Sequence, residues 1–341
     1  MSYQVLARKW RPQNFTEVIG QQHIVRSLQN VILSDRPGNA YLFSGTRGVG
    51  KTTVARIFAR ALRCEDRRDP SPCNKCFSCQ ESRSSMNILE MDGASQNSVD
   101  NIRDLVDNVQ YLPTSGKYKI YIIDEVHMLS SSAFNALLKT LEEPPAHVVF
   151  ILATTVPEKL LDTVVSRCLH FDFRKVPLNI LKNYFKETAQ KENIVFSDDK
   201  LIDRICRQSG GSIRDGLSLL EQVLNYAPDK KIDERILASA LGLAKPAMID
   251  KLLSAVLSGD STNCSVIFRT LIRENVALEN ILSSLLEALF EMIEKGRQKK
   301  DQFSMAELLW IFETLAKDSE WTVNSPHPEM VTEIALQKLS L

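Results

Sequence analysis

The chain has no excess charge of either sign and no long hydrophobic run. Its 42 lysines and arginines balance 42 aspartates and glutamates, which excludes a chain-wide attraction to nucleic acid but leaves room for a local basic face. The longest wholly apolar run, Val148–Ala153, is far too short to cross a bilayer. The first twelve residues have no apolar stretch of the kind that a signal peptide requires. We therefore expect a cytoplasmic protein with no membrane partner.

Cysteines are scarce outside one segment. Four of the seven lie within sixteen residues, and in a reducing compartment clustered cysteines bind metal more often than they form disulfides. Their spacing, C-x8-C-x2-C-x2-C, suits tetrahedral Zn²⁺ and leaves no open coordination position, so we expect a structural zinc in an inserted loop. A C-x-x-C redox pair is the alternative. The predicted zinc ligands are Cys64, Cys73, Cys76 and Cys79, and we expect the other three to be ordinary buried residues: Cys168, Cys206 and Cys264.

Near-continuous apolar runs alternate with helical patterns in the first half of the chain. This alternation predicts a parallel sheet covered by helices on both faces. The predicted strands are 40–44, 88–92, 119–124, 148–154 and 169–173. After residue 242, glycine and proline are rare, and apolar residues recur at helical spacing between Leu278 and Ile293. We expect an α/β domain at 1–178, a helical domain at 179–242 with breaks at Gly210-Gly211 and near Pro228, and an all-α domain at 243–341.

The segment GTRGVGKT, residues 45–52, fits the phosphate-binding pattern G-x-x-x-x-G-K-[ST] between a predicted strand and a predicted helix. Its glycines let backbone N–H groups turn toward the phosphates of ATP, and the helix N-terminus favours their negative charge. Lys51 would reach the β- and γ-phosphates, and Thr52 would offer its hydroxyl to Mg²⁺. A glycine turn that matches by chance is the alternative. The expected nucleotide contacts are Gly45, Thr46, Arg47, Gly48, Val49, Gly50, Lys51, Thr52 and Thr53.

Polar side chains follow two of the predicted strands. The strand IYII ends in Asp124 and Glu125, at the edge where open α/β sheets hold their ligands. Asp124 would hold the Mg²⁺ shell, and Glu125 would orient or deprotonate the attacking water. At the end of the next strand, we choose Thr155 over Thr154 as the group that would bond the water or the γ-phosphate. A solvated loop start and a plain polar strand cap are the alternatives.

Two further segments suggest contacts with other macromolecules. Arg56, Arg60 and Arg63 share one face of the helix after the phosphate loop, and we favour an interface with a neighbouring subunit over a solvated face. The segment 94–103 resembles a helix start capped by Ser or Asn, whose N–H groups could meet a DNA phosphate without reading sequence. Simple capping is the alternative.

Together these motifs resemble one family over essentially the whole chain. The strings YLFSGTRGVGKTT, IYIIDEVHMLSSSAFNALLKTLEEPP, TVVSRC and GGSIRDGLSLLEQ, in this order, are similar to the bacterial DnaX (gamma/tau) family. Its members are AAA+ ATPases of the DNA polymerase III clamp loader. The resemblance implies an AAA+ phosphate-loop domain with a parallel sheet and a zinc insert, then a helical lid at 179–242 and a helical collar at 243–341.

The resemblance also implies roles for single residues. The arginine of TVVSRC, Arg167, would act in trans on the ATP of the next subunit, and Arg214 of GGSIRDG would contact nucleotide from the lid. Thr155 matches the family's first sensor, and the four clustered cysteines match its zinc module. The string WRPQNFTEVIG resembles the adenine side of the pocket, with candidates Arg11, Pro12, Val18 and Ile19.

The family further implies partners. These are other copies of the chain in a ring-like pentamer, the delta and delta-prime subunits, the beta sliding clamp, and the phosphate backbone of primed DNA. The stretch Gln96-Asn97-Ser98 departs from the basic residues that the family can carry at its DNA-facing helix, so a contact there would use backbone N–H groups and polar side chains. A branch-migration helicase and a non-hydrolysing scaffold like delta-prime are the alternative functions.

Overall fold

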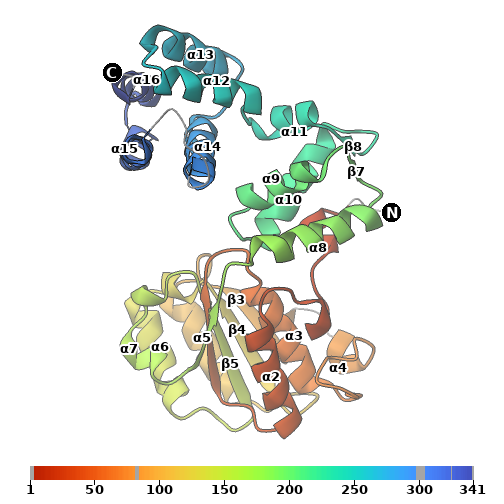
Figure 1. The fold of residues 1–341 in the computed structure, drawn as a ribbon. Helices are drawn as coiled ribbons and strands as arrows, with labels where there is room; N and C mark the ends of the chain where they lie inside the picture. The colour runs from red at the N-terminus through yellow and green to blue at the C-terminus, as the bar shows by residue number, and fades with distance from the viewer. Residues whose placement is uncertain (1–3, 81–83, 297–303, 324, 340–341) are drawn as a thin grey trace. The chain divides into compact units, whose positions relative to one another are not determined.

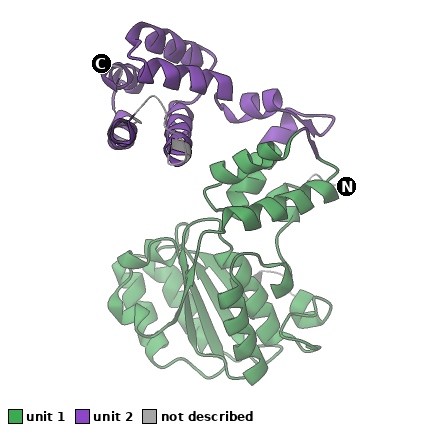
Figure 2. Cartoon of the chain, in the orientation of Figure 1, with its two compact units in different colours: residues 1–194, 198–221 green, residues 195–197, 222–341 purple. Residues whose placement is uncertain are grey.

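The computed structural model describes residues 4–80, 84–296, 304–323 and 325–339. The chain forms two compact units, one of residues 1–194 and 198–221 and the other of residues 195–197 and 222–341 (Figure 2). We describe each unit by itself. The three-domain division that the sequence suggests stays a prediction.

The first unit contains a six-stranded sheet in the order β2-β3-β4-β5-β1-β6. All neighbouring strands are parallel except β2, which runs antiparallel to β3. The five predicted strands are confirmed, whereas the two-residue β2 was not predicted. The strands are β1 (Ala40–Gly45), β2 (Ser84–Ser85), β3 (Ile88–Asp92), β4 (Lys119–Asp124), β5 (Val148–Thr154) and β6 (Leu169–Phe173).

Helices cover both faces of this sheet (Figure 1). On one face Tyr41 and Phe43 of β1 share a core with helices α2 (Gln22–Ser34) and α3 (Lys51–Arg63). Leu42, between them in the strand, belongs to the core on the other face, since successive strand side chains point to opposite sides. That second core includes residues of α5 (Val99–Val109), α6 (Ser131–Glu142) and α7 (Asp162–Val165). Burial on both faces explains why the strands read as continuous apolar runs.

Shorter elements and three more helices complete the first unit. The turn between α9 and α10 contains Gly210 and Gly211, both at positive φ, which confirms the predicted break. The elements are α1 (Leu6–Lys9), η1 (Phe15–Glu17), α4 (Phe77–Gln80), η2 (Val126–Met128), η3 (Pro157–Lys159), α8 (Leu178–Lys191), α9 (Asp199–Gln208) and α10 (Ile213–Asn225), of which the last four residues fall in the second unit.

The second unit is mainly helical, as predicted after residue 242. Its core includes Ile281, Leu285 and Leu289, which follow the predicted helical spacing. Two very short strands, β7 (Val195–Phe196) and β8 (Lys231–Ile232), pair in parallel where the sequence suggested only helix. Within the described residues, none of the helices combines the length and hydrophobicity that crossing a membrane requires. The helices are α11 (Glu234–Leu241), α12 (Pro246–Leu257), α13 (Ser261–Arg273), α14 (Leu278–Gly296), α15 (Met305–Val323) and α16 (Pro328–Leu339).

Candidate nucleotide-binding site

The phosphate-loop segment joins the end of β1 to the start of α3. Gly48 lies in this turn with φ +76°, and a Cβ atom there would lie 1.9 Å from Oγ of Ser212. Gly50, with φ +106°, is the residue before the helix. A side chain would therefore be strained at both positions, and at Gly48 it would also collide with the start of α10. The glycines allow the close backbone approach that the motif predicted.

Lys51 is the first residue of α3 and is only 5% exposed. Its Nζ donates hydrogen bonds to the backbone oxygens of Gly45 at 2.7 Å and Thr46 at 3.0 Å. Burial lowers the pKa of Lys51, while the nearby carboxylates of Glu125 and Asp124 act in the opposite direction. A buried ammonium beside the loop is suited to an anionic ligand, because a phosphate oxygen would compensate for its lost hydration.

Thr52 and Asp124 bring the loop and the acidic strand end together. The hydroxyl of Thr52 donates to Oδ2 of Asp124 over 2.6 Å. A hydroxyl and a carboxylate oxygen at one point are ligands of the kind that Mg²⁺ takes beside nucleotide phosphates. The two residues that the sequence assigned separately to the magnesium shell are therefore neighbours.

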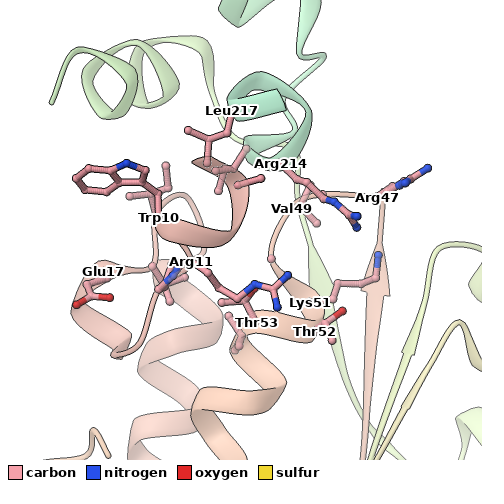
Figure 3. A pocket seen from close by; sticks show the side chains of 18 of the residues that line it. Trp10, Arg11, Glu17, Arg47, Val49, Lys51, Thr52, Thr53, Arg214 and Leu217 are labelled. Atoms are coloured by element: carbon pink, nitrogen blue, oxygen red, sulfur yellow. The ribbon is translucent and has the colours of Figure 1, made fainter. Parts of the chain in front are cut away.

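These groups line a cavity of about 160 Å³ in the first unit (Figure 3). One part is formed by the segment around Trp10 and Arg11, another by the phosphate loop, and a third by α10 with Arg214 and Leu217. Most predicted nucleotide contacts line it: Arg11, Pro12, Val18, Ile19, Arg47, Gly48, Val49, Gly50, Lys51, Thr52, Thr53, Asp124, Glu125 and Arg214. The sequence interpretation missed Ala7, Trp10, Glu17, Val54, Tyr184, Ile213 and Leu217. Trp10 and Glu17 lie within the WRPQNFTEVIG string, whereas Tyr184 carries no motif.

Glu125 lies between the cavity and the end of β5. Its backbone is left-handed, with φ +46° and ψ +45°, an uncommon conformation for a residue with a long side chain. Thr155 donates to its Oε2 atom over 2.9 Å. Thr155 thus contacts the predicted general base, and its predicted bond to water or phosphate stays a prediction.

Arg167 is not among the residues that line this cavity. It follows α7, and its side chain is one-third exposed. Its Nη2 lies 2.7 Å from Oε1 of Glu142, and its Nη1 donates to the backbone oxygen of Thr163 over 2.5 Å. An exposed arginine away from its own chain's cavity is placed suitably for the predicted action in trans, which stays a prediction.

The four clustered cysteines have the geometry of one metal site. Their sulfur atoms all lie within 4.8 Å of one another, and those of Cys73 and Cys79 are 3.9 Å apart. Tetrahedral zinc with Zn–S bonds of about 2.3 Å requires sulfurs roughly 3.8 Å apart, so the set fits this ion. The backbone N–H groups of Cys76 and Lys75 donate to Cys73 Sγ, and these bonds lower the pKa of the Cys73 thiol to about 6. Burial raises the pKa of the Cys64 and Cys79 thiols, so it is the four converging sulfurs that favour a metal over a single redox pair.

The predicted interface of three arginines is wrong for Arg63. This residue is 1% exposed, and its Nη2 donates to the backbone oxygen and the hydroxyl of Ser115. Arg56 is paired with Glu90 of β3, and only Arg60 reaches a more exposed partner, Gln13. The face is mostly turned inward because α3 packs on the sheet.

The predicted cap of the helix at residue 99 is confirmed. Oγ of Ser98 accepts a hydrogen bond from the N–H group of Asn101 over 3.3 Å. A contact of this helix with DNA stays a prediction.

One cavity thus brings together the phosphate loop between β1 and α3, the acidic pair at the end of β4 and residues of a following helix. This arrangement is that of a P-loop ATPase of the AAA+ class. Solved structures support the fold. The RuvB Holliday junction branch migration motor of Thermotoga maritima matches with a TM-score of 0.53 and 19% identity, over 73% of this chain and 79% of that one. Residues 20–177 match the family model of the DNA polymerase III delta subunit.

Curated relatives identify the family. DNA polymerase III subunit gamma of Buchnera aphidicola (subsp. Baizongia pistaciae) is 42% identical over 86% of this chain and 79% of its own length. Subunit tau of Escherichia coli is 40% identical over 85% of this chain and 45% of its own length, and that of Bacillus subtilis is 36% identical over 99% and 63%. The chain belongs to the gamma/tau family, the clamp-loader ATPases of DNA polymerase III. It spans about four fifths of that gamma subunit but only 45% and 63% of these two tau subunits.

Proposed function

We propose that this chain binds and hydrolyses ATP in the cavity described above and thereby loads the beta sliding clamp onto primed DNA. The observation that carries the proposal is the convergence of Lys51, Thr52, Asp124 and Glu125 on one cavity, with Thr52 and Asp124 in direct contact. All four groups of a hydrolysing P-loop site are present. A non-hydrolysing scaffold would not require them together.

ATP and Mg²⁺ would occupy this cavity in defined orientations. The backbone N–H groups of residues 45–50 would surround the phosphates, and Lys51 would contact the β- and γ-phosphates. Thr52 and Asp124 would hold Mg²⁺, which neutralises charge on the phosphates when bound. The adenine would lie near Arg11, Pro12, Val18 and Ile19, and Arg214 would contact the nucleotide from the lid.

Hydrolysis would begin with a water beside Glu125. The carboxylate would take one proton from the water while the water oxygen attacks the γ-phosphorus. The bond between the γ-phosphorus and the β-phosphate oxygen would break, so that ADP and phosphate are formed. Arg167 of the neighbouring copy would stabilise charge on the transferred group. Fast hydrolysis would therefore depend on assembly.

Zn²⁺ would be held by Cys64, Cys73, Cys76 and Cys79 and would stabilise the loop between α3 and β3. The four thiolates fill a tetrahedral shell, so the ion has a structural role. Cys79 packs near the backbone oxygen of Arg60, at 4.0 Å, which links the loop to α3.

The proposed partners follow from the family. They are further copies of the chain, the delta and delta-prime subunits, the beta clamp and the phosphate backbone of primed DNA. The collar at 243–341 would hold the copies together. Since the relatives are named as subunits of a DNA polymerase, we further propose that the chain acts in the cytoplasm, together with DNA.

The test is ATP hydrolysis by the chain alone and then with delta, delta-prime, clamp and primed DNA. We expect weak turnover alone and strong stimulation by the full mixture. Arg167→Ala should lose the stimulation and still bind ATP, and Glu125→Gln should bind ATP and turn it over only at a small residual rate, about 10²- to 10⁴-fold below the wild type. ATP that is bound but never cleaved by the wild type in any mixture would support the scaffold function. Stimulation that survives in Arg167→Ala would remove only the role of that arginine.

A further inference from the structure

The carboxylate of Glu125 is held at one of its two oxygen atoms. The hydroxyl of Thr155 donates to Oε2 over 2.9 Å, and Nδ1 of His127 lies 3.4 Å from the same atom. Within the described part of the chain, no hydrogen bond to Oε1 is formed. One oxygen is thus anchored, and the other is available to a ligand or a water.

His127 is itself fixed in place. Its side chain is 8% exposed, and Nδ1 lies 3.0 Å from Oγ1 of Thr154. Thr154 is completely buried, and its Oγ1 accepts the backbone N–H group of Val156 over 3.1 Å. A backbone group therefore orients the threonine hydroxyl, the hydroxyl orients the imidazole ring, and the ring faces the carboxylate.

We propose that His127 is a positioning residue for ATP hydrolysis, which fixes Glu125 so that Oε1 receives the proton of the attacking water. The inference rests on the proposed function, in which Glu125 is the general base. With its proton on Nδ1, the ring donates to Oγ1 of Thr154 and keeps its polar N–H edge 3.4 Å from Oε2, beside the hydrogen bond that this oxygen accepts from Thr155. His127 touches neither water nor nucleotide in this arrangement and acts only through Glu125.

The physical reason is the freedom of the glutamate side chain. A glutamate has three side-chain torsions, and its side chain is 31% exposed here, so that solvent would otherwise let it rotate away from the reacting water. A general base is effective only within hydrogen-bond reach of the proton that it accepts. Two neighbouring residues at the end of β5, Thr154 and Thr155, restrict this freedom, one through His127 and one directly.

Two variants distinguish the effect of the ring nitrogen of His127 from the effect of the ring's volume. His127→Phe keeps a planar ring of similar size and loses the nitrogen, whereas His127→Asn retains an amide that can donate near the place of Nδ1. Both are made in the wild type and in Glu125→Gln. ATP turnover is measured in the full mixture of subunits, clamp and primed DNA, with the melting temperature and ATP affinity of each variant.

We expect His127→Phe to lower kcat about tenfold, a fraction of the contribution that a general base makes, with KM for ATP changed less than about twofold. His127→Asn should recover most of the rate. In the Glu125→Gln background, His127→Phe should cause no further loss, because the group that it positions is already disabled.

Other results would overturn the inference. They are a wild-type kcat in His127→Phe, a tenfold loss that persists in Glu125→Gln, or a loss confined to KM. If His127→Phe does not fold, Thr154→Val decides in its place, with an expected loss of about threefold against Thr154→Ser as the control that keeps the hydroxyl. If Glu125→Gln itself leaves turnover unchanged, the general-base role of Glu125 fails and the inference on His127 fails with it. The proposed function fails separately, if the wild type never cleaves ATP in any mixture.

Discussion

Arg167 and Glu142 form an ion pair within one chain, with Nη2 and Oε1 2.7 Å apart. The second Nη atom of Arg167 donates to the backbone oxygen of Thr163. An arginine that acts on the ATP of a neighbouring subunit must exchange or share these partners with a phosphate. Glu142 is the last residue of α6 and therefore lies at the negative end of the helix dipole. The guanidinium group of Arg167 offsets the negative charge of Glu142 at this position.

We predict that Glu142→Gln makes it easier for Arg167 to contact the ATP of a neighbouring subunit. Since Arg167 is one-third and Glu142 half exposed, water and salt weaken the pair, and the expected gain is small. The subunit concentration for half-maximal stimulated ATP hydrolysis should fall about two- to fivefold at low salt, and the gain should shrink at high salt. In the Arg167→Ala background, Glu142→Gln should bring no gain. A lower kcat in Glu142→Gln alone would instead mean that the carboxylate positions the arginine.

Lys51→Met should abolish the stabilisation of the protein by MgATP. At 100 times the dissociation constant, ATP stabilises the wild type by about 2.7 kcal/mol, which a thermal-shift titration detects. The matched control is Lys119→Met. Lys119 is also a buried lysine that donates to a backbone oxygen, that of Asn108, but it does not line the cavity. The control should change the melting temperature and keep the ATP-dependent shift; loss of the shift in both variants would contradict a specific role for Lys51.

Gly48→Ala should weaken nucleotide binding about tenfold or more. The new methyl group would collide with Ser212 Oγ, and the residue would be held at φ +76°. Gly116→Ala is the control, because Gly116 has a similar φ of +67° but its Cβ would meet Arg63 only at ordinary contact distance, 3.6 Å. Calorimetric titration with ATP measures the affinity of both. Equal affinities would show that loop and lid can separate without loss of binding.

Removal of one zinc ligand should affect the inserted loop more than the nucleotide site. Cys76→Ser should lower the metal content from about one zinc per chain to nearly none and reduce the melting temperature. ATP affinity should change less than about twofold, because none of the four cysteines lines the cavity. Metal analysis measures the zinc content, and ATP titration measures the affinity. The control is Cys168→Ser, outside the cluster, which should alter neither quantity. A full complement of zinc in Cys76→Ser would contradict the four-sulfur site.

The sheet and the phosphate loop could be predicted because their signals are local. Continuous apolar runs reveal strands buried on both faces, and glycines beside Lys51 and Thr52 reveal the loop. The two-residue strands β2, β7 and β8 have no such signal, since two residues show no periodicity. Residues 84–85 and 195–196 therefore read as loop or helix.

Contacts between residues that are distant along the chain could not be predicted from the sequence. Arg63 looks like a surface cation until Ser115, 52 positions later, accepts its hydrogen bonds. The string DEVH shows nothing that marks His127 of η2, whose partner Thr154 lies 27 residues away at the end of β5. Most of the side chains that line the cavity belong to recognisable strings, with Tyr184 as an exception, whereas side chains that hold those residues in place depend on the tertiary structure.

The left-handed backbone of Glu125 lowers the stability of the fold, whereas its carboxylate is needed for the proposed ATP hydrolysis. For a residue with a Cβ atom this conformation costs about 1–2 kcal/mol, a cost that glycine avoids and asparagine tolerates better. Libraries of variants selected for heat resistance alone should thus accumulate glycine or asparagine at position 125 and lose catalysis. Selection for replication in growing cells should restore the glutamate, so the amino acid found at this one position reports which demand was imposed on the chain.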